Sequence, residues 1–130
     1  MENTQSKKIL VVEDEKALRR ALVDTLTGAG FVVLEASDGV EGLDIALKQR
    51  PDLVLTDRDM PGMDGLKMLG EIRKDEGWGK KVPVVVLTNL SLSDDESVKG
   101  VSGLNPTYYL VKADWDISDI VANVKSSLGG

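Results

Sequence analysis

The sequence contains no cysteine and no histidine. Without cysteine, neither a disulfide framework nor a thiolate metal site can form. The absence of histidine excludes Ser-His-Asp and Cys-His nucleophilic catalysis, histidine-ligated zinc and a role as a phosphohistidine carrier. Any chemistry must therefore come from carboxylates, hydroxyls, lysines or a metal ion that prefers oxygen ligands.

Long apolar runs and an excess of positive charge are also missing. No run approaches the roughly 18 apolar residues of a membrane span, and the N-terminus lacks a signal-peptide pattern. The net charge of −6 disfavours contact with a nucleic-acid backbone. We therefore expect a cytoplasmic protein that binds neither membranes nor nucleic acid directly.

The 130 residues are enough for one domain with a real core. We expect a flexible tail over residues 1–7 and a folded domain over residues 8–130. Short apolar runs with strand character are found at Lys8–Val12, Phe31–Ala36, Asp52–Asp57, Val82–Leu87 and Tyr108–Val111. Each of these strands is followed by a segment with the apolar period of a helix. This alternation predicts an α/β domain in which five helices cover a parallel sheet of five strands.

Local signals mark where the helices begin and end. The first helix begins near Lys16, with Gly30 at its C-terminal cap, and the second follows an Asp38–Glu41 capping box. The segment from Lys74 to Lys81 is predicted to be a polar connection. A weak helix is expected after Ser93, and the last helix has a clear apolar period from Ile117 to Leu128.

The stretch from Leu53 to Leu66 organises the rest of the chain. Its apolar strand stops at Asp57, and a loop marked by Pro61, Gly62 and Gly65 follows. This pattern places Asp57 at the carboxyl end of a central strand, where open α/β sheets carry their chemistry.

Other polar residues follow or end neighbouring strands, namely Glu13, Asp14, Thr88 and Lys112. The carboxyl ends of parallel strands share one edge, so these groups can converge on Asp57. Two carboxylates about 4 Å apart repel by roughly 4 kcal/mol at an effective dielectric near 20. Either one of the carboxylates is therefore protonated or a cation lies among them, and for a cation the hard oxygen ligands favour Mg²⁺. With Asp57 as in-line nucleophile, such a site suits an incoming phosphoryl group, whose oxygens Thr88 and Lys112 would bind.

These residues, with Met60-Pro61-Gly62-Met63-Asp64-Gly65 and Tyr109, resemble the receiver domain of two-component response regulators. The single-domain chemotaxis regulators are nearest in size, and the resemblance runs from Lys8 to Leu128. It implies a flavodoxin-like, doubly wound fold with strand order 2-1-3-4-5. It also implies that a histidine kinase or phosphotransfer protein phosphorylates Asp57 to an aspartyl phosphate. Mg²⁺ would be held by Glu13, Asp14, Asp57 and the backbone carbonyl of Arg58.

The resemblance further implies how a signal leaves the domain. The Tyr109 rotamer would follow a move of Thr88. That change would alter the surface made by the helix after Ser93, the Tyr108–Val111 strand and the last helix, where an unidentified downstream protein would bind. On this interpretation the protein is no enzyme, beyond catalysing its own phosphoryl transfer and slow self-dephosphorylation.

Some positions depart from the family pattern. Asn89 stands where a small residue is usual, and Asp59 adds a carboxylate at a position that tunes loss of the phosphoryl group. Ala113 replaces the usual proline after Lys112. A cis bond before a residue other than proline costs about 3–4 kcal/mol, so we expect a trans Lys112–Ala113 bond.

Two alternatives remain open. Asp57-Arg58-Asp59 also resembles the Asp-x-Asp motif of haloacid-dehalogenase-like phosphatases, although that family places the motif on its first strand. The other alternative is a receiver-like interaction module that works without phosphorylation, which the changes at Asn89 and Ala113 would suit.

Overall fold

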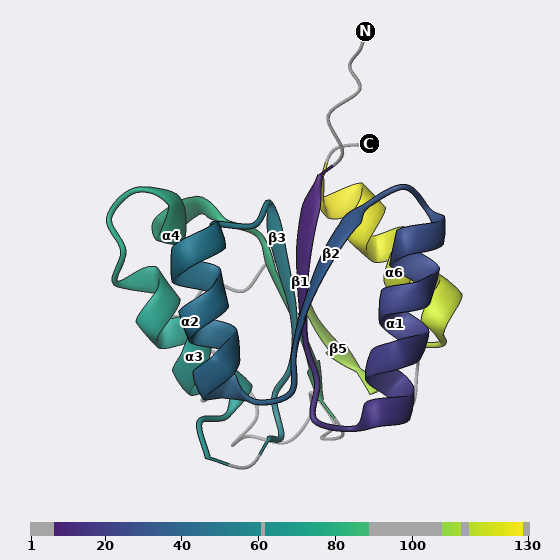
Figure 1. Ribbon diagram of the computed structural model, residues 1–130, viewed down its shortest axis with the longest axis horizontal. Coiled ribbons are helices and arrows are strands. Elements are labelled where there is room, and N and C mark those ends of the chain that lie inside the picture. Colours follow the sequence, from purple (N-terminus) through teal and green to yellow (C-terminus); the bar gives the residue numbers. More distant parts are fainter. Residues whose placement is uncertain (1–6, 61, 89–107, 113–114, 129–130) are drawn as a thin grey trace, which may run out of the picture.

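The computed structural model describes residues 7–60, 62–88, 108–112 and 115–128. A five-stranded, all-parallel sheet of order β2-β1-β3-β4-β5 forms its centre (Figure 1). The strands are β1 (Lys8–Val12), β2 (Val32–Ala36), β3 (Leu53–Asp57), β4 (Val84–Thr88) and β5 (Tyr108–Val111). The predicted fold class and strand order are therefore confirmed.

Helices cover both faces of the sheet (Figure 1). One face carries α1 (Lys16–Gly28) and α6 (Ile117–Ser127), and the other carries α2 (Gly39–Gln49), α3 (Gly65–Arg73) and the short α4 (Trp78–Lys81). The helix predicted after Ser93 and residues 1–6 of the predicted tail lie outside the described residues. Within the part of the chain that is described, no helix combines the length and the apolar character that crossing a membrane requires.

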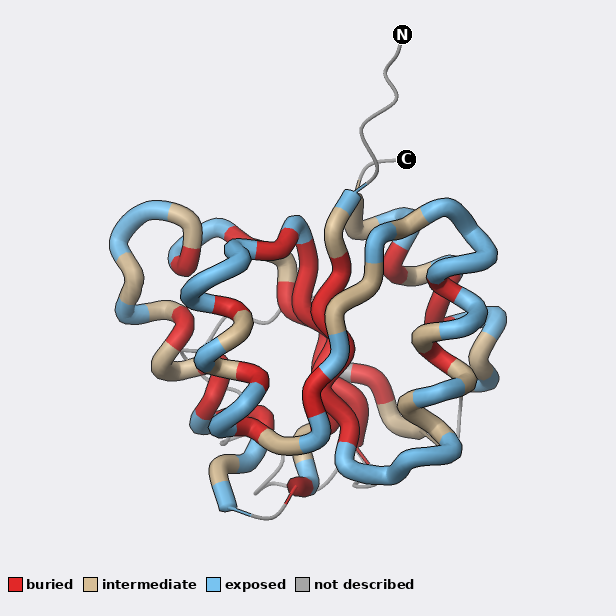
Figure 2. Tube along the Cα trace, in the orientation of Figure 1, coloured by how far each residue is buried: buried red, intermediate tan, exposed pale blue. Residues whose placement is uncertain are grey.

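The core consists of two apolar layers, one on each face of the sheet. Alternate residues of a strand point to opposite faces, so Leu10 and Val12 join the layer under α2 and α3. Ile9 and Val11 join the layer under α1 and α6. Figure 2 shows the result as buried central strands with exposed outer helix surfaces. Because the central strands are buried on both faces, polar side chains gather where the strands end.

The start of α2 confirms half of the predicted capping box. The Asp38 side chain accepts a hydrogen bond from the Glu41 backbone N–H at 2.8 Å. The Glu41 carboxylate, however, accepts from the backbone N–H of Ser37 at 2.8 Å rather than from that of Asp38. At the end of α1, Gly30 has a φ of 100°, which suits glycine after a helix.

The segment from Lys74 to Lys81 differs from its prediction as a polar connection. Residues Trp78–Lys81 form the helical turn α4. Trp78 packs against the core and donates its indole N–H to the Pro51 carbonyl at 2.7 Å. The Val82 N–H bonds the Trp78 carbonyl at 2.9 Å, and β4 begins only at Val84. The polar sequence did not indicate this turn, because the turn is stabilised by the contact of Trp78 with Pro51, which is distant in the sequence.

Candidate functional site

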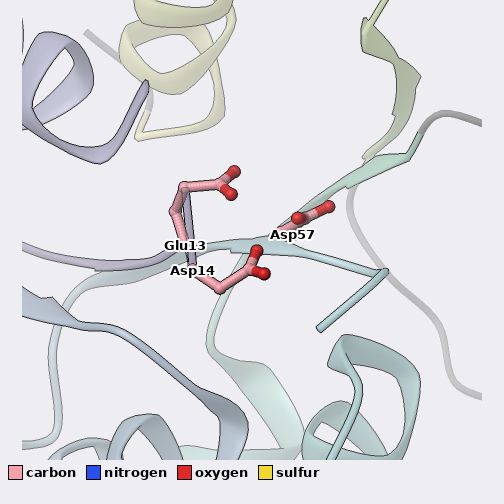
Figure 3. A group of neighbouring side chains, drawn as sticks. All are labelled: Glu13, Asp14 and Asp57. Carbon is pink, nitrogen blue, oxygen red and sulfur yellow. The ribbon is translucent and has the colours of Figure 1, made fainter. Parts of the chain in front are cut away.

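Three carboxylates converge at the carboxyl edge of the sheet (Figure 3). Glu13 and Asp14 follow β1, and Asp57 is the last residue of β3. The two strands pair directly, with Val12 opposite Thr56, so the chain brings the next residues to the same level. One ligand oxygen from each of the three lies within 4.8 Å of the others. Glu13 and Asp57 are 1% and 3% exposed, and Asp14 is exposed.

Lys112 supplies positive charge to this cluster. It follows β5, and its Nζ lies 3.2 Å from Asp57 Oδ2 and 3.3 Å from Glu13 Oε1. Burial opposes the ammonium charge, but the two carboxylates outweigh that effect and raise the pKa of Lys112. The predicted convergence of Lys112 on Asp57 is therefore present, and the contact with Glu13 adds a partner that the sequence did not reveal.

Burial makes the ionised forms of Glu13 and Asp57 less favourable, and the nearby positive charge only partly compensates. Burial, chiefly, raises the pKa of Glu13 from 4.5 to about 7, although the Glu15 N–H and Lys112 lower it. Burial also raises the pKa of Asp57, with Lys112 opposing the effect. One ammonium therefore does not fully offset the cost of placing these carboxylates at the sheet edge.

Thr88 and Asp59 are connected to Asp57 by hydrogen bonds. Thr88 is fully buried at the end of β4, and its hydroxyl donates to Asp59 Oδ2 at 3.3 Å. The backbone N–H of Asp59 in turn donates to Asp57 Oδ1 at 3.3 Å. The hydroxyl of Thr88 is thus linked to Asp57 through one residue, beside the atoms where chemistry is expected.

The loop after β3 is fixed by its backbone. Arg58 donates its N–H to the Leu87 carbonyl at 2.7 Å, and the Arg58 carbonyl accepts from the Gly65 N–H at 3.0 Å. A Cβ on Gly65 would collide with the backbone of Asp57 and Arg58. A glycine at this position therefore lets α3 begin directly against the residue that carries the central carboxylate.

The donor set fits a hard divalent cation. All three candidate ligands are carboxylates, and Asp14 is open to solvent, which leaves room for water ligands. With the three ionised, the single ammonium of Lys112 leaves two negative charges uncompensated. A cation of charge two balances that deficit, and oxygen ligands of this kind suit Mg²⁺ better than zinc.

Several residues predicted to belong to the site or to its switch lie wholly or partly outside the described residues. The backbone of Tyr109 lies in β5, but its side chain is outside the description, as are Asn89, Pro61 and Ala113. The Lys112–Ala113 bond, predicted to be trans, therefore stays a prediction. Arg19 was not predicted to lie near the site, and its guanidinium donates to the Glu13 carbonyl. Its only signal is its place one turn into the helix that follows the acidic loop.

Comparison with known proteins gives one family. A family model described as the response regulator receiver domain matches residues 9–125. The probable transcriptional regulator ycf27 of Porphyridium aerugineum is 36% identical over 124 residues, which cover 95% of this chain and 49% of that protein. The transcriptional regulatory protein HprR of Escherichia coli K12 is 38% identical over 122 residues, covering 93% of this chain and 51% of that protein. The chain thus spans about half the length of these curated relatives.

Solved structures agree with this match. The chemotaxis response regulator CheY4 of Vibrio cholerae superposes with a TM-score of 0.83 at 28% identity, covering 95% of this chain and 99% of that one. The signal receiver domain of a signal transduction histidine kinase from Syntrophus aciditrophicus gives a TM-score of 0.85 at 26% identity, covering 96% and 92%. The family match runs from β1 into α6 and so includes every strand whose end contributes to the acidic site. On this ground the chain belongs to the receiver domains of two-component response regulators.

Proposed function

We propose that this receiver domain accepts a phosphoryl group on Asp57 from a histidine kinase or a phosphotransfer protein. The observation that carries the proposal is the convergence of Glu13, Asp14 and Lys112 on a buried strand-end carboxylate. A carboxylate nucleophile needs the negative charge of the incoming group to be neutralised nearby. Asp57 has such a positive charge beside it, because Lys112 Nζ lies 3.2 Å from its Oδ2.

Each residue of the site has a part in the transfer. A carboxylate oxygen of Asp57 attacks the phosphorus, and the bond from phosphorus to the donor nitrogen breaks with its electron pair going to the imidazole. Lys112 already contacts Oδ2 of Asp57, so it can follow the charge onto the phosphoryl oxygens. The Thr88 hydroxyl would exchange its contact with Asp59 for one with a phosphoryl oxygen.

Mg²⁺ is the cofactor proposed for this reaction. Glu13, Asp14, Asp57 and the backbone carbonyl of Arg58 would hold it. When bound, the ion supplies positive charge to the oxygens of the transferring group. The carbonyl of Arg58 already accepts one hydrogen bond from Gly65, and a carbonyl oxygen keeps a second lone pair for a metal.

The proposed output is a change of partner binding in the cytoplasm rather than turnover of a substrate. Movement of Thr88 would be followed by Tyr109 and would alter a surface that includes α6 and β5. A downstream protein would bind there. Beyond phosphorylating and slowly dephosphorylating itself, the domain would have no enzymatic activity.

Intact-mass analysis after incubation with acetyl phosphate and Mg²⁺ tests this function. The wild type should gain one phosphoryl group, and Asp57→Asn or EDTA should abolish the gain. Asp44→Asn is the matched control, because Asp44 is an exposed acid on α2 that pairs with Lys48. Equal labelling of wild type and Asp57→Asn would refute the assignment.

The same samples separate the alternatives. A wild type that binds partners but never gains mass would indicate an interaction module. Steady hydrolysis of p-nitrophenyl phosphate would indicate a phosphatase.

A further inference from the structure

Glu13 is held at each of its four polar positions. Its N–H donates to the Ala36 carbonyl at 3.1 Å, and its carboxylate accepts from the Glu15 N–H at 3.0 Å and from Lys112 at 3.3 Å. The fourth contact comes from α1, where Arg19 Nη1 donates to the Glu13 carbonyl at 2.8 Å. Arg19 is the only one of these partners that reaches Glu13 from α1 with a side chain.

The Arg19 guanidinium is itself fixed from a second direction. Its Nε lies 3.2 Å from Oε1 of Glu35 on β2, and its side chain is 17% exposed. The two contacts use different nitrogens of one planar group, so together they define its orientation. Arg19 therefore ties the loop after β1 to the edge strand β2.

This tie acts on the peptide that joins the two acidic residues. The Glu13 carbonyl and the Asp14 N–H belong to one planar peptide unit, so a bond to that carbonyl restrains the direction in which Asp14 leaves the strand. Among the described residues the Asp14 carboxylate itself has no hydrogen-bond or ion-pair partner. Its place within 4.8 Å of Glu13 and Asp57 therefore depends on the backbone.

We infer that Arg19 is a positioning residue for the metal site, holding the Glu13–Asp14 peptide so that both carboxylates face Asp57. The inference rests on the proposed function, because it assigns to Arg19 the preorganisation of the Mg²⁺ ligands. Arg19 touches neither the metal nor the phosphoryl group on this account. It acts through the backbone of the ligands, as outer partners of metal sites commonly do.

The sign of the effect separates positioning from simple charge. A guanidinium near a dication repels it, so removing the charge alone would tighten Mg²⁺ binding. Loss of positioning would weaken binding instead. Arg20 provides the matched control, since it is the next residue on α1, is exposed, and pairs only weakly with Asp24 at 3.8 Å.

Isothermal titration with Mg²⁺ alone, near neutral pH, is the test. Arg19→Gln should bind Mg²⁺ about tenfold more weakly than the wild type, the lower end of the effect of removing an outer partner. Arg20→Gln should bind equally or slightly more tightly. Arg19→Lys keeps the charge but offers a single nitrogen, so it should also lose affinity, and it serves if Arg19→Gln does not fold. Unchanged or tighter binding by both Arg19 variants would overturn the inference.

Labelling by acetyl phosphate distinguishes this failure from failure of the proposed function. Arg19→Gln should gain the phosphoryl group slowly at limiting Mg²⁺ and at the wild-type rate when Mg²⁺ is saturating. A rate that stays low at saturation would overturn the positioning role. A wild type that binds no Mg²⁺ and gains no mass would refute the proposed function, whereas a normal wild type beside an unaffected Arg19→Gln refutes only the role of Arg19.

Discussion

Replacing Glu13 with glutamine should remove a pH dependence from the stability of the metal-free protein. Burial raises the pKa of Glu13 from 4.5 to about 7, so the folded protein holds this proton more tightly than the unfolded chain. Stability that is fully present below pH 4.5 is therefore lost as the pH rises to about 7. At about 1.4 kcal/mol per pH unit, this interval corresponds to a loss of about 3 kcal/mol.

Glutamine imitates the protonated acid without titrating. It keeps an oxygen that can accept the Glu15 N–H, now bonded to Glu13 Oε2 at 3.0 Å. Lys112 loses one partner but retains Asp57 at 3.2 Å. Glu13→Gln should thus match the wild type near pH 4.5 and exceed it by up to about 3 kcal/mol above pH 7.

Urea unfolding at a series of pH values, with EDTA present, measures this difference. Titrating groups away from the site contribute equally to both proteins and cancel in the difference between the two curves, which therefore reports Glu13 together with Asp57 and Lys112, the groups that interact with it. Glu15→Gln is the control, because it removes an exposed carboxylate two residues away. Parallel curves for wild type and Glu13→Gln would show that the Glu13 carboxylate is not strained by burial, and would refute the reasoning.

Two further predictions concern Asp57 and the loop behind it. In metal-free buffer near neutral pH, Asp57→Asn should be more stable than the wild type by on the order of 1 kcal/mol, because burial raises the pKa of Asp57 despite Lys112; an equal or lower urea midpoint would contradict this. Gly65→Ala should lower both the urea midpoint and the yield of acetyl-phosphate labelling, because its Cβ would push against the backbone of Asp57 and Arg58. Gly28→Ala, where a Cβ meets nothing within 4 Å, is its control, and equal behaviour of the two variants would show that the contact at Gly65 is harmless.

The sheet and the central carboxylates could be predicted because their signals are local. Strands buried on both faces read as short apolar runs, as Leu53–Asp57 does with five buried residues. The strand order 2-1-3-4-5, which the family resemblance implied, makes β1 and β3 neighbours, and their parallel pairing then places Glu13 beside Asp57. Because strands and helices alternate, the strands are parallel and their carboxyl ends, where the polar residues stand, lie at the same edge of the sheet.

Contacts between side chains far apart in sequence could not be predicted in this way. Lys112 and Glu13 are separated by 99 positions, and nothing local to either residue shows that a lysine aimed at Asp57 also reaches Glu13. The α4 turn depends on Trp78 bonding Pro51, and the role of Arg19 depends on an acceptor on another element. Such contacts follow from the distances between elements rather than from local propensity or period.

The resident ammonium changes how the acidic site should respond to phosphorylation. From the sequence alone, repulsion among the carboxylates implied either a protonated carboxylate or a cation among them, and in the structure Lys112 already lies within 3.3 Å of both Glu13 and Asp57. A phosphoryl group on Asp57 adds negative charge next to this lysine and competes with Glu13 for it. Release of Glu13 from Lys112 would leave a buried carboxylate, 1% exposed, without its cation, which is costly unless another cation takes that place. Metal binding and phosphorylation should therefore reinforce each other, because Lys112 would divide one positive charge between Glu13 and the phosphoryl group and the metal would supply the charge that is then missing.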